Sequence, residues 1–308
     1  MKKIILLISA FFIAGFYSNA QRVGSSPEYI KTLTSEWKGD RLPDGRPNVS
    51  DALLERLKNV SLEEAWGVLR GNGYHDQFEG NWTIIHPENV MTGRVVTAQY
   101  MPLRPDLEKV VKAQGIKEGR AAKGGTNSWP IDILTTGDVY VADGYGKIVD
   151  GTLIGDNLGN SIYANSQNGV VFYGSVRDQE GLEKIKGFNA WILGADPSAI
   201  DRMMLTSINS PIRIGRATVL PGDVVLAKEY GVVFIPAYLV EDLVRSAEIT
   251  ALRDEFGHQR LREKKYLPGQ IDSQWSEDIN NDFWNWLENY DGKLYMSVQE
   301  IKEYLNNK

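Results

Sequence analysis

Short apolar runs typical of strands alternate with helix-like segments through the middle of the chain, and this alternation constrains the fold most. Residues 93–100 are rich in β-branched side chains, and residues 106–117 follow with a helical pattern. Further strand-like runs lie at 139–143, 170–173, 190–193 and in pieces of 212–235, and further helix-like segments begin at Asp156 and Pro236. Because no long linker interrupts this order, we expect a single α/β core from about residue 51 to residue 256.

The segment before this core differs in composition. Residues 21–50 are rich in Ser, Gly, Pro and charged side chains, which predicts an extended lead-in. A helix is expected after a cap at Asn48 or Ser50. A second helix is expected after Ser61, where Glu64 completes a capping-box pattern.

The segment after the core, residues 257–308, is polar and holds an aromatic cluster. A helical pattern places Phe283, Trp286, Leu287 and Tyr290 on one face. We expect this C-terminal helical extension to dock on its own core or on a neighbouring subunit. The alternative is a platform that stacks on carbohydrate.

The first twenty residues predict a signal peptide. Two lysines precede an apolar stretch, residues 4–16, which is short for a membrane span. Ser18 and Ala20 then form a small-x-small cleavage site before Gln21. The alternative is an uncleaved N-terminal anchor. We expect export across a bacterial inner membrane to the periplasm or beyond, with no membrane attachment after cleavage.

Composition excludes several classes of site and partner. The chain of 308 residues has no cysteine, which excludes disulfides, thiolate metal sites and cysteine nucleophiles. Its formal net charge is −6 and it shows no basic stripe, so a nucleic-acid partner is not expected.

The first candidate for chemistry is the run Gly155-Asp156-Asn157-Leu158, which precedes a helical pattern. Asp156 is expected to cap this helix, which would leave the amides of Asn157 and Leu158 free at its positive end. Such a helix start suits a carboxylate or enolate oxygen. An ordinary capped helix start is the better explanation of the run when it is taken alone.

The second candidate is the pair Arg177-Asp178, which follows the apolar strand 170–173. Ligands in open α/β sheets gather at the carboxyl ends of strands. Arginine can bind a carboxylate through two parallel hydrogen bonds, and aspartate oxygen suits Mg²⁺ or Mn²⁺. A surface ion pair is the alternative. Because a strand–helix–strand unit returns to the same sheet edge, Asp156 and this pair are expected to converge on one ligand.

These residues resemble the signature of the RraA-like family, which includes metal-dependent class II pyruvate aldolases acting on 4-hydroxy-4-methyl-2-oxoglutarate and a ribonuclease activity regulator. The resemblance extends over residues 51–256. Flanking segments that share it are 93–97, 131–132, 137–139, 221–225 and 231–236. The runs 131–132 and 137–139 resemble the family's approach to the site.

The resemblance implies a fold and a role for each site residue. The fold would be an α/β/β sandwich of the swivelling-domain type, assembled as a homotrimer or a dimer of trimers. This chain departs from the family in its extensions at both ends, which we expect to be helical. Gly155, Asp156, Asn157 and Leu158 would bind the substrate through backbone amides. Arg177 would bind the substrate carboxylate, Asp178 would ligate Mg²⁺ or Mn²⁺, and Asp156 would hold a metal-bound water.

The implied activity is a lyase that cleaves a carbon–carbon bond of a small 2-oxo acid through a pyruvate enolate, with oxaloacetate decarboxylation as a possible second activity. The residues do not identify the base. Two alternatives stay open: a non-catalytic binding or regulatory protein, and a periplasmic enzyme for another oxo acid or an oxidised sugar. Two departures from the family pattern, at 190–194 and 228–231, bear on the substrate rather than on the metal site.

Histidines offer a weaker signal. His75, His86 and His258 show no metal-ligand spacing. His75 lies in a polar and aromatic loop, residues 74–79, and either reaches the site or is an ordinary loop histidine.

Overall fold

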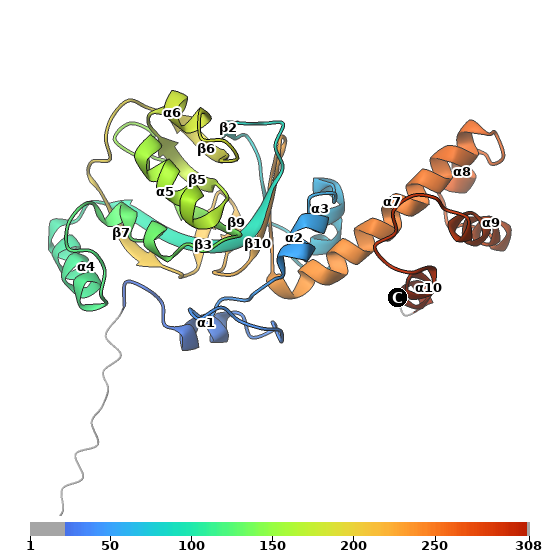
Figure 1. Ribbon diagram of the computed structural model, residues 1–308, viewed down its shortest axis with the longest axis horizontal. Helices are drawn as coiled ribbons and strands as arrows, with labels where there is room; N and C mark the ends of the chain where they lie inside the picture. Colours follow the sequence, from blue (N-terminus) through green and yellow to red (C-terminus); the bar gives the residue numbers. More distant parts are fainter. Residues whose placement is uncertain (1–21, 307–308) are drawn as a thin grey trace, which may run out of the picture.

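A computed structural model describes residues 22–306, and a nine-stranded sheet lies at their centre (Figure 1). Its strands are β1 (Phe78–Glu79), β2 (Thr83–Ile84), β3 (Met91–Pro102), β4 (Asp138–Asp143), β5 (Val170–Val176), β6 (Ala190–Ala195), β7 (Met203–Ile208), β10 (Val224–Lys228) and β11 (Gly231–Ile235). They run in the order β1-β11-β10-β3-β4-β5-β6-β2, with β7 paired to the second half of β3. Strands β3, β4, β5 and β6 are parallel to one another, so their carboxyl ends share one edge of the sheet.

Side chains alternate between the two faces of this sheet, and both faces are covered. In β4, Val139 and Val141 pack into one hydrophobic cluster, whereas Tyr140 and Ala142 pack into another. This two-sided burial explains why the sequence of the parallel strands is continuously apolar instead of alternating.

Three layers result. On one face, α4 (Pro105–Lys117) and α5 (Asp156–Ser166) pack in the cluster that covers the parallel strands, while α2 (Asp51–Leu57), α3 (Leu62–Gly71) and α7 (Val240–Arg262) cover β10 and β11. The hairpin of β8 (Ile212–Ile214) and β9 (Ala217–Val219) covers the other face. The predicted α/β/β sandwich is confirmed. The remaining helices are α1 (Pro27–Leu33), α6 (Gln179–Glu183), α8 (Pro268–Ile271), α9 (Glu277–Glu288), α10 (Val298–Asn306) and three short 3₁₀ turns at Thr126–Ser128, Ile131–Ile133 and Ala237–Leu239.

The predicted helix starts before the sheet are confirmed. Ser50 caps α2 by accepting a hydrogen bond from the Leu53 amide at 3.3 Å. Ser61 and Glu64 form both bonds of the capping box at the start of α3.

The lead-in is not extended throughout, which corrects the expectation for residues 21–50. Ser26 caps α1, and Pro27 occupies its first turn, where a missing amide hydrogen does no harm. Ile30 of this helix is fully buried. The local capping signal therefore outweighed the polar composition of the segment.

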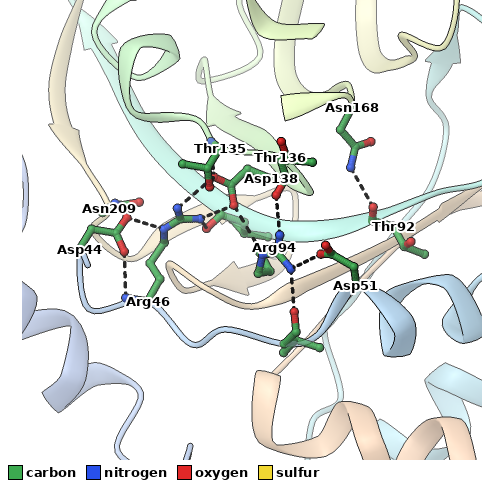
Figure 2. A network of polar contacts seen from close by, with 12 residues as sticks. Asp44, Arg46, Asp51, Thr92, Arg94, Thr135, Thr136, Asp138, Asn168 and Asn209 are labelled. Carbon is green, nitrogen blue, oxygen red and sulfur yellow. Dashed lines mark hydrogen bonds and ion pairs between the residues drawn. The ribbon is translucent and has the colours of Figure 1, made fainter. Parts of the chain in front are cut away.

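A buried polar network ties the lead-in to the sheet (Figure 2). Both terminal nitrogens of Arg46 donate to the Asp138 carboxylate, at 2.8 and 3.0 Å, and its Nε donates to Asp44 at 2.6 Å. Arg94 reaches the Val49 carbonyl and the Asp51 carboxylate, each at 2.7 Å. Burial lowers the pKa of Arg46, but the carboxylates of Asp138 and Asp44 outweigh that effect and raise it overall.

Asp138 belongs to this network and not to the candidate site. It starts β4, whereas the candidate residues follow the carboxyl end of the parallel neighbour β5, so the two lie at opposite edges of the sheet. The expected approach to the site through residues 137–139 is therefore wrong. The motif fits a structural role instead, because Asp138 is fully buried and paired.

The C-terminal residues form an arm that leads away from the sandwich along α7 (Figure 1). A separate hydrophobic cluster joins the second half of α7 to α9 and α10, with Phe256, Phe283 and Leu287 buried inside it. The expected docking of α9 thus occurs on α7 and not on the sheet. Figure 1 places α9 at the far end of the molecule from α6, which adjoins Arg177-Asp178.

Within residues 22–306, every helix is too short or too polar to cross a bilayer. The signal peptide expected at residues 1–20 lies outside the described residues.

Candidate functional site

An open hollow lies where β5 and β6 end. Asp156 at the start of α5 lines it together with Arg177 and Asp178, which follow β5. The rest of the lining comes from α6 and the end of β6: Gln179, Glu180 and Gly181 of α6, Lys184 directly after it, Ala195 at the end of β6, and Asp196 and Pro197 after β6. The expected convergence of Asp156 with the Arg-Asp pair is therefore seen in the fold.

Backbone contacts hold the two halves of the hollow together. The segment before α5 runs beside the end of β5, where the Leu153 amide donates to Ser175 and the Arg177 amide donates to Ile154, each at 2.9 Å. A Cβ atom on Gly155 would collide with the Asp178 carboxylate and would lie 3.2 Å from Arg177 Nε. Glycine at position 155 thus permits the close approach of the helix start to the Arg-Asp pair.

Asp178 turns the chain from β5 into α6. Its backbone is left-handed, with φ 55° and ψ 41°, a conformation that aspartate adopts more readily than most residues. Its carbonyl accepts hydrogen bonds from the amides of Gly181 and Leu182. Its carboxylate makes no side-chain cap to the helix, so the carboxylate oxygens stay available to a ligand.

Arg177 and Asp178 form a loose ion pair. Arg177 Nε lies 3.6 Å from Asp178 Oδ2, and the side chains are 45% and 41% exposed. Exposed pairs of this kind contribute about 0–1 kcal/mol to stability. Among residues 22–306 no side-chain hydrogen bond engages the Arg177 guanidinium, so it is free to bind a carboxylate.

The start of α5 differs from the prediction, in which Asp156 caps the helix and the amides of Asn157 and Leu158 are free to bind a ligand. Gly155, not Asp156, is the N-cap, and the Asp156 carboxylate accepts a hydrogen bond from the Asn157 amide at 2.8 Å. The expected cap at Asp156 is therefore wrong, and the Asn157 amide is already paired. Of residues 155–158, Asp156 alone is in the lining of the hollow.

Asp196 was missed from the sequence, although the same reasoning that selected Arg177-Asp178 applies to it. It directly follows β6, the parallel neighbour of β5, so it reaches the same sheet edge. Hydrogen bonds from Ser198 lower the pKa of the Asp196 carboxyl, and one of them joins the Ser198 amide to Asp196 Oδ1 at 2.9 Å. Asp196 is therefore an additional fixed negative charge in the hollow.

The charges and donor atoms of the hollow suit a hydrated divalent cation. Four carboxylates, from Asp156, Asp178, Glu180 and Asp196, face two cationic side chains, Arg177 and Lys184, so the formal charge is −2. No group of three or more His, Asp and Glu side chains within the described residues is placed to enclose a metal ion. Mg²⁺ commonly keeps several waters and takes one or two carboxylates, which this hollow supplies.

Two other predicted contributors lie elsewhere. His75 lines a different pocket, with Tyr74 and Tyr238, and is absent from the lining of the Arg177 hollow. The aromatic residues of α9 pack in the cluster of the C-terminal arm.

Comparison with known proteins fits this geometry. The sequence model of the RraA-like family, described as Aldolase/RraA, matches residues 46–234, more than half of the 308 residues. The chain belongs to the RraA-like family. The matched range contains Asp156 and the Arg177-Asp178 pair, whereas α1 and the C-terminal arm lie outside it.

Two similar proteins match different lengths of the chain. Protein DlpA of Legionella pneumophila is 28% identical over 216 residues, which are 69% of this chain and 31% of DlpA. A protein of Shewanella oneidensis with the provisional name 4-hydroxy-4-methyl-2-oxoglutarate aldolase is 35% identical over 103 residues, 31% of this chain and 62% of that protein. The chain thus spans less than two thirds of either relative.

A solved structure supports the fold. Streptomyces coelicolor RraAS2, described as an unusual member of the RNase ES inhibitor RraA protein family, superimposes with a TM-score of 0.59 at 25% identity. The match covers 69% of this chain and all of that chain. The arrangement of sheet and helices seen here is therefore that of the family.

Proposed function

We propose that this protein is a divalent-metal-dependent lyase that cleaves a carbon–carbon bond of a small 2-oxo acid and releases pyruvate. The convergence of Asp156, Arg177 and Asp178 in one open hollow carries this proposal. Its support from relatives is the similarity to proteins with the provisional name 4-hydroxy-4-methyl-2-oxoglutarate aldolase, at 30% to 35% identity for two of them.

Each side chain has a role that follows from its chemistry. The Arg177 guanidinium binds the substrate carboxylate through paired hydrogen bonds and orients the adjacent keto group. Asp178, and Asp156 through water, hold Mg²⁺ or Mn²⁺. When bound, the cation supplies Lewis-acid stabilisation of the negative charge that develops on the keto oxygen. Oxaloacetate decarboxylation develops the same charge and is proposed as a second activity.

The test is pyruvate release from a panel of 2-oxo acids, including 4-hydroxy-4-methyl-2-oxoglutarate and oxaloacetate, with Mg²⁺ or Mn²⁺. EDTA should abolish release, and added metal should restore it. Arg177→Ala should lower kcat/KM at least a hundredfold, because two charge-assisted hydrogen bonds, each worth roughly 1.5–3 kcal/mol, together contribute about 3 kcal/mol or more. Asp178→Ala should reduce release to the background rate.

The chain offers a matched control for these two variants. Asp201 and Arg202 form another exposed pair, also with 3.6 Å between Arg202 Nε and Asp201 Oδ2. Asp201→Ala and Arg202→Ala should keep the wild-type rate. Wild-type rates of pyruvate release in both Arg177→Ala and Asp178→Ala would contradict the proposal. If no acid in the panel gives pyruvate with either metal, a non-catalytic binding protein is favoured instead.

We also propose that the enzyme acts after export, in the periplasm or outside the cell, on the strength of the signal-peptide pattern at residues 1–20. An oxidised sugar is the alternative substrate class, and it would be favoured if the C-terminal aromatic residues lined the Arg177 hollow. The aromatic residues at 283–290 pack on α7 and not around Arg177.

A further inference from the structure

A second cavity lies away from the Arg177 hollow and shares no lining residue with it. Its volume is about 390 Å³, within the range of pockets that bind small molecules. Four segments build it: the end of α1 and the residues after it (33–37), the loop 73–77, the region around β9 (216–223) and the turn 236–238. The first and last of these lie outside the range that the family model matches. The cavity is thus partly a product of this chain's own lead-in.

A buried carboxyl group lines this cavity. Asp223 is 4% exposed, and its Oδ2 accepts a hydrogen bond from the Leu220 amide at 2.8 Å. Among residues 22–306, neither a salt bridge nor a second side-chain hydrogen bond engages Asp223. Burial raises the pKa of Asp223 to about 7. A buried carboxylate without a counter-ion is unfavourable, so a cationic ligand would stabilise it.

Aromatic side chains supply apolar walls beside this carboxyl group. Trp37, Tyr74 and Tyr238 all line the cavity, and the hydroxyl groups of Tyr74 and Tyr238 lie 2.9 Å apart, within hydrogen-bond distance. Burial and the Tyr238 hydrogen bond raise the pKa of Tyr74 to about 12, with smaller contributions from the charges of Asp223 and Glu36. The phenol of Tyr74 therefore stays neutral at neutral pH.

The charge of the cavity opposes anions. Glu36 and Asp76 join Asp223 in the lining, against Arg216 and the single histidine His75. The Arg216 Nε donates to the Phe78 carbonyl at 2.9 Å and lies 4.0 Å from Glu79 Oε2, and the three carboxyl groups of the lining outnumber this one arginine. A 2-oxo acid would be repelled here.

We propose that this cavity binds a small organic amine, with its ammonium group on Asp223 and its apolar body against Trp37, Tyr74 and Tyr238. Carboxylate and aromatic faces together are the chemistry that recognises organic ammonium ions, because both attract the cation while the rings cover its apolar part. This site is independent of the lyase proposed above, so either proposal can fail without the other.

The test is calorimetric titration of the mature chain with three probes of similar shape: benzylamine, benzyl alcohol and benzoate. Benzylamine should bind saturably, benzyl alcohol at least tenfold more weakly, and benzoate not at all. Asp223→Asn should lower benzylamine affinity at least tenfold. Asparagine can still accept the Leu220 hydrogen bond, so the turn should persist. Asp291→Asn, an exposed aspartate on the C-terminal arm, should bind benzylamine like the wild type.

A second variant guards against a folding defect in Asp223→Asn. Tyr238 is 39% exposed, so Tyr238→Ala should fold normally and weaken benzylamine binding by removing one wall. Equal affinity for benzylamine and benzyl alcohol would overturn the proposal, as would wild-type affinity in both variants. Saturable binding of a neutral hexose with no binding of benzylamine would also overturn it, and would identify a sugar pocket instead.

Discussion

Individual charged residues in this protein fall into two groups with different physical consequences. Arg46 and Asp138 are buried and form an ion pair with each other, so removing either partner leaves a buried charge without its counter-ion. Arg177 and Asp178 are nearly half exposed and touch only loosely, so they contribute little to stability. In the proposed function, each of them binds a ligand at the edge where the parallel strands end.

Asp223 leads to a prediction about pH and stability. Its pKa is about 7 in the folded chain and about 3.9 in an unfolded one, so between these values the native state holds a proton that the unfolded state has lost. Stability should therefore fall as pH rises through this window, by up to about 1.4 kcal/mol per pH unit. Ionisable groups that face Asp223 across the cavity are Glu36, Tyr74, His75, Asp76, Arg216 and Tyr238.

Urea unfolding of wild type and Asp223→Asn at about pH 5 and pH 7 measures this contribution. The stability of the variant relative to wild type should increase between the two pH values, because asparagine cannot ionise. Comparison of the two chains at each pH cancels the titration of every other group. A difference that stays constant with pH would contradict the raised pKa.

At the scale of elements, the lead-in is a structural part of the core and not a loose connection. Arg46 places its guanidinium beside the first residue of β4, and Arg94 of β3 reaches back to the Val49 carbonyl and to Asp51 (Figure 2). Earlier in the lead-in, Trp37 and the end of α1 line the second cavity. The buried network thus positions an element that the family match does not include.

Asp138→Ala should destabilise the fold by about 3–5 kcal/mol, since it leaves the Arg46 guanidinium buried without its main partner. Chemical unfolding measures the loss, and protease cleavage within residues 22–50 should become faster. Asp51→Ala is the control: its side chain is 75% exposed in its pair with Arg94, so the cost should stay within about 1 kcal/mol. Equal effects of the two variants would show that burial of the network is unimportant.

At the scale of the whole molecule, two hydrophobic assemblies share one helix. The first half of α7 packs on β10 and β11, and its second half carries the cluster that holds α9 and α10. The aromatic residues of the C-terminal arm therefore stabilise the arm itself, with Phe256 within 6 Å of both Phe283 and Trp275, measured between ring centroids. This arrangement accounts for an aromatic cluster in an otherwise polar segment.

The resemblance to the RraA-like family also leads us to predict a homotrimer or a dimer of trimers in solution. Light scattering coupled to size-exclusion chromatography should give three or six times the mass of one chain. Dilution over the tested range should leave that mass unchanged. A mass of one chain at every concentration would contradict the prediction.

The sequence pattern alone determined the α/β core and most of the strands, because a buried parallel sheet requires continuous apolar runs and amphipathic helices between them. The three-layer arrangement was expected from the resemblance to the RraA-like family. It also identified Asp156 and Arg177-Asp178, since strand ends and helix starts can be located from apolar runs and glycines. The tertiary structure decided the rest. It paired the Asn157 amide with Asp156, added Asp196 to the hollow and assigned Asp138 to a buried network. The Asn157 bond is local, and Asp196 follows a strand end that the apolar run at 190–193 already marks. The pairing of Asp138 with Arg46 joins segments distant in the chain, and local sequence pattern does not show which partner a charged side chain will meet.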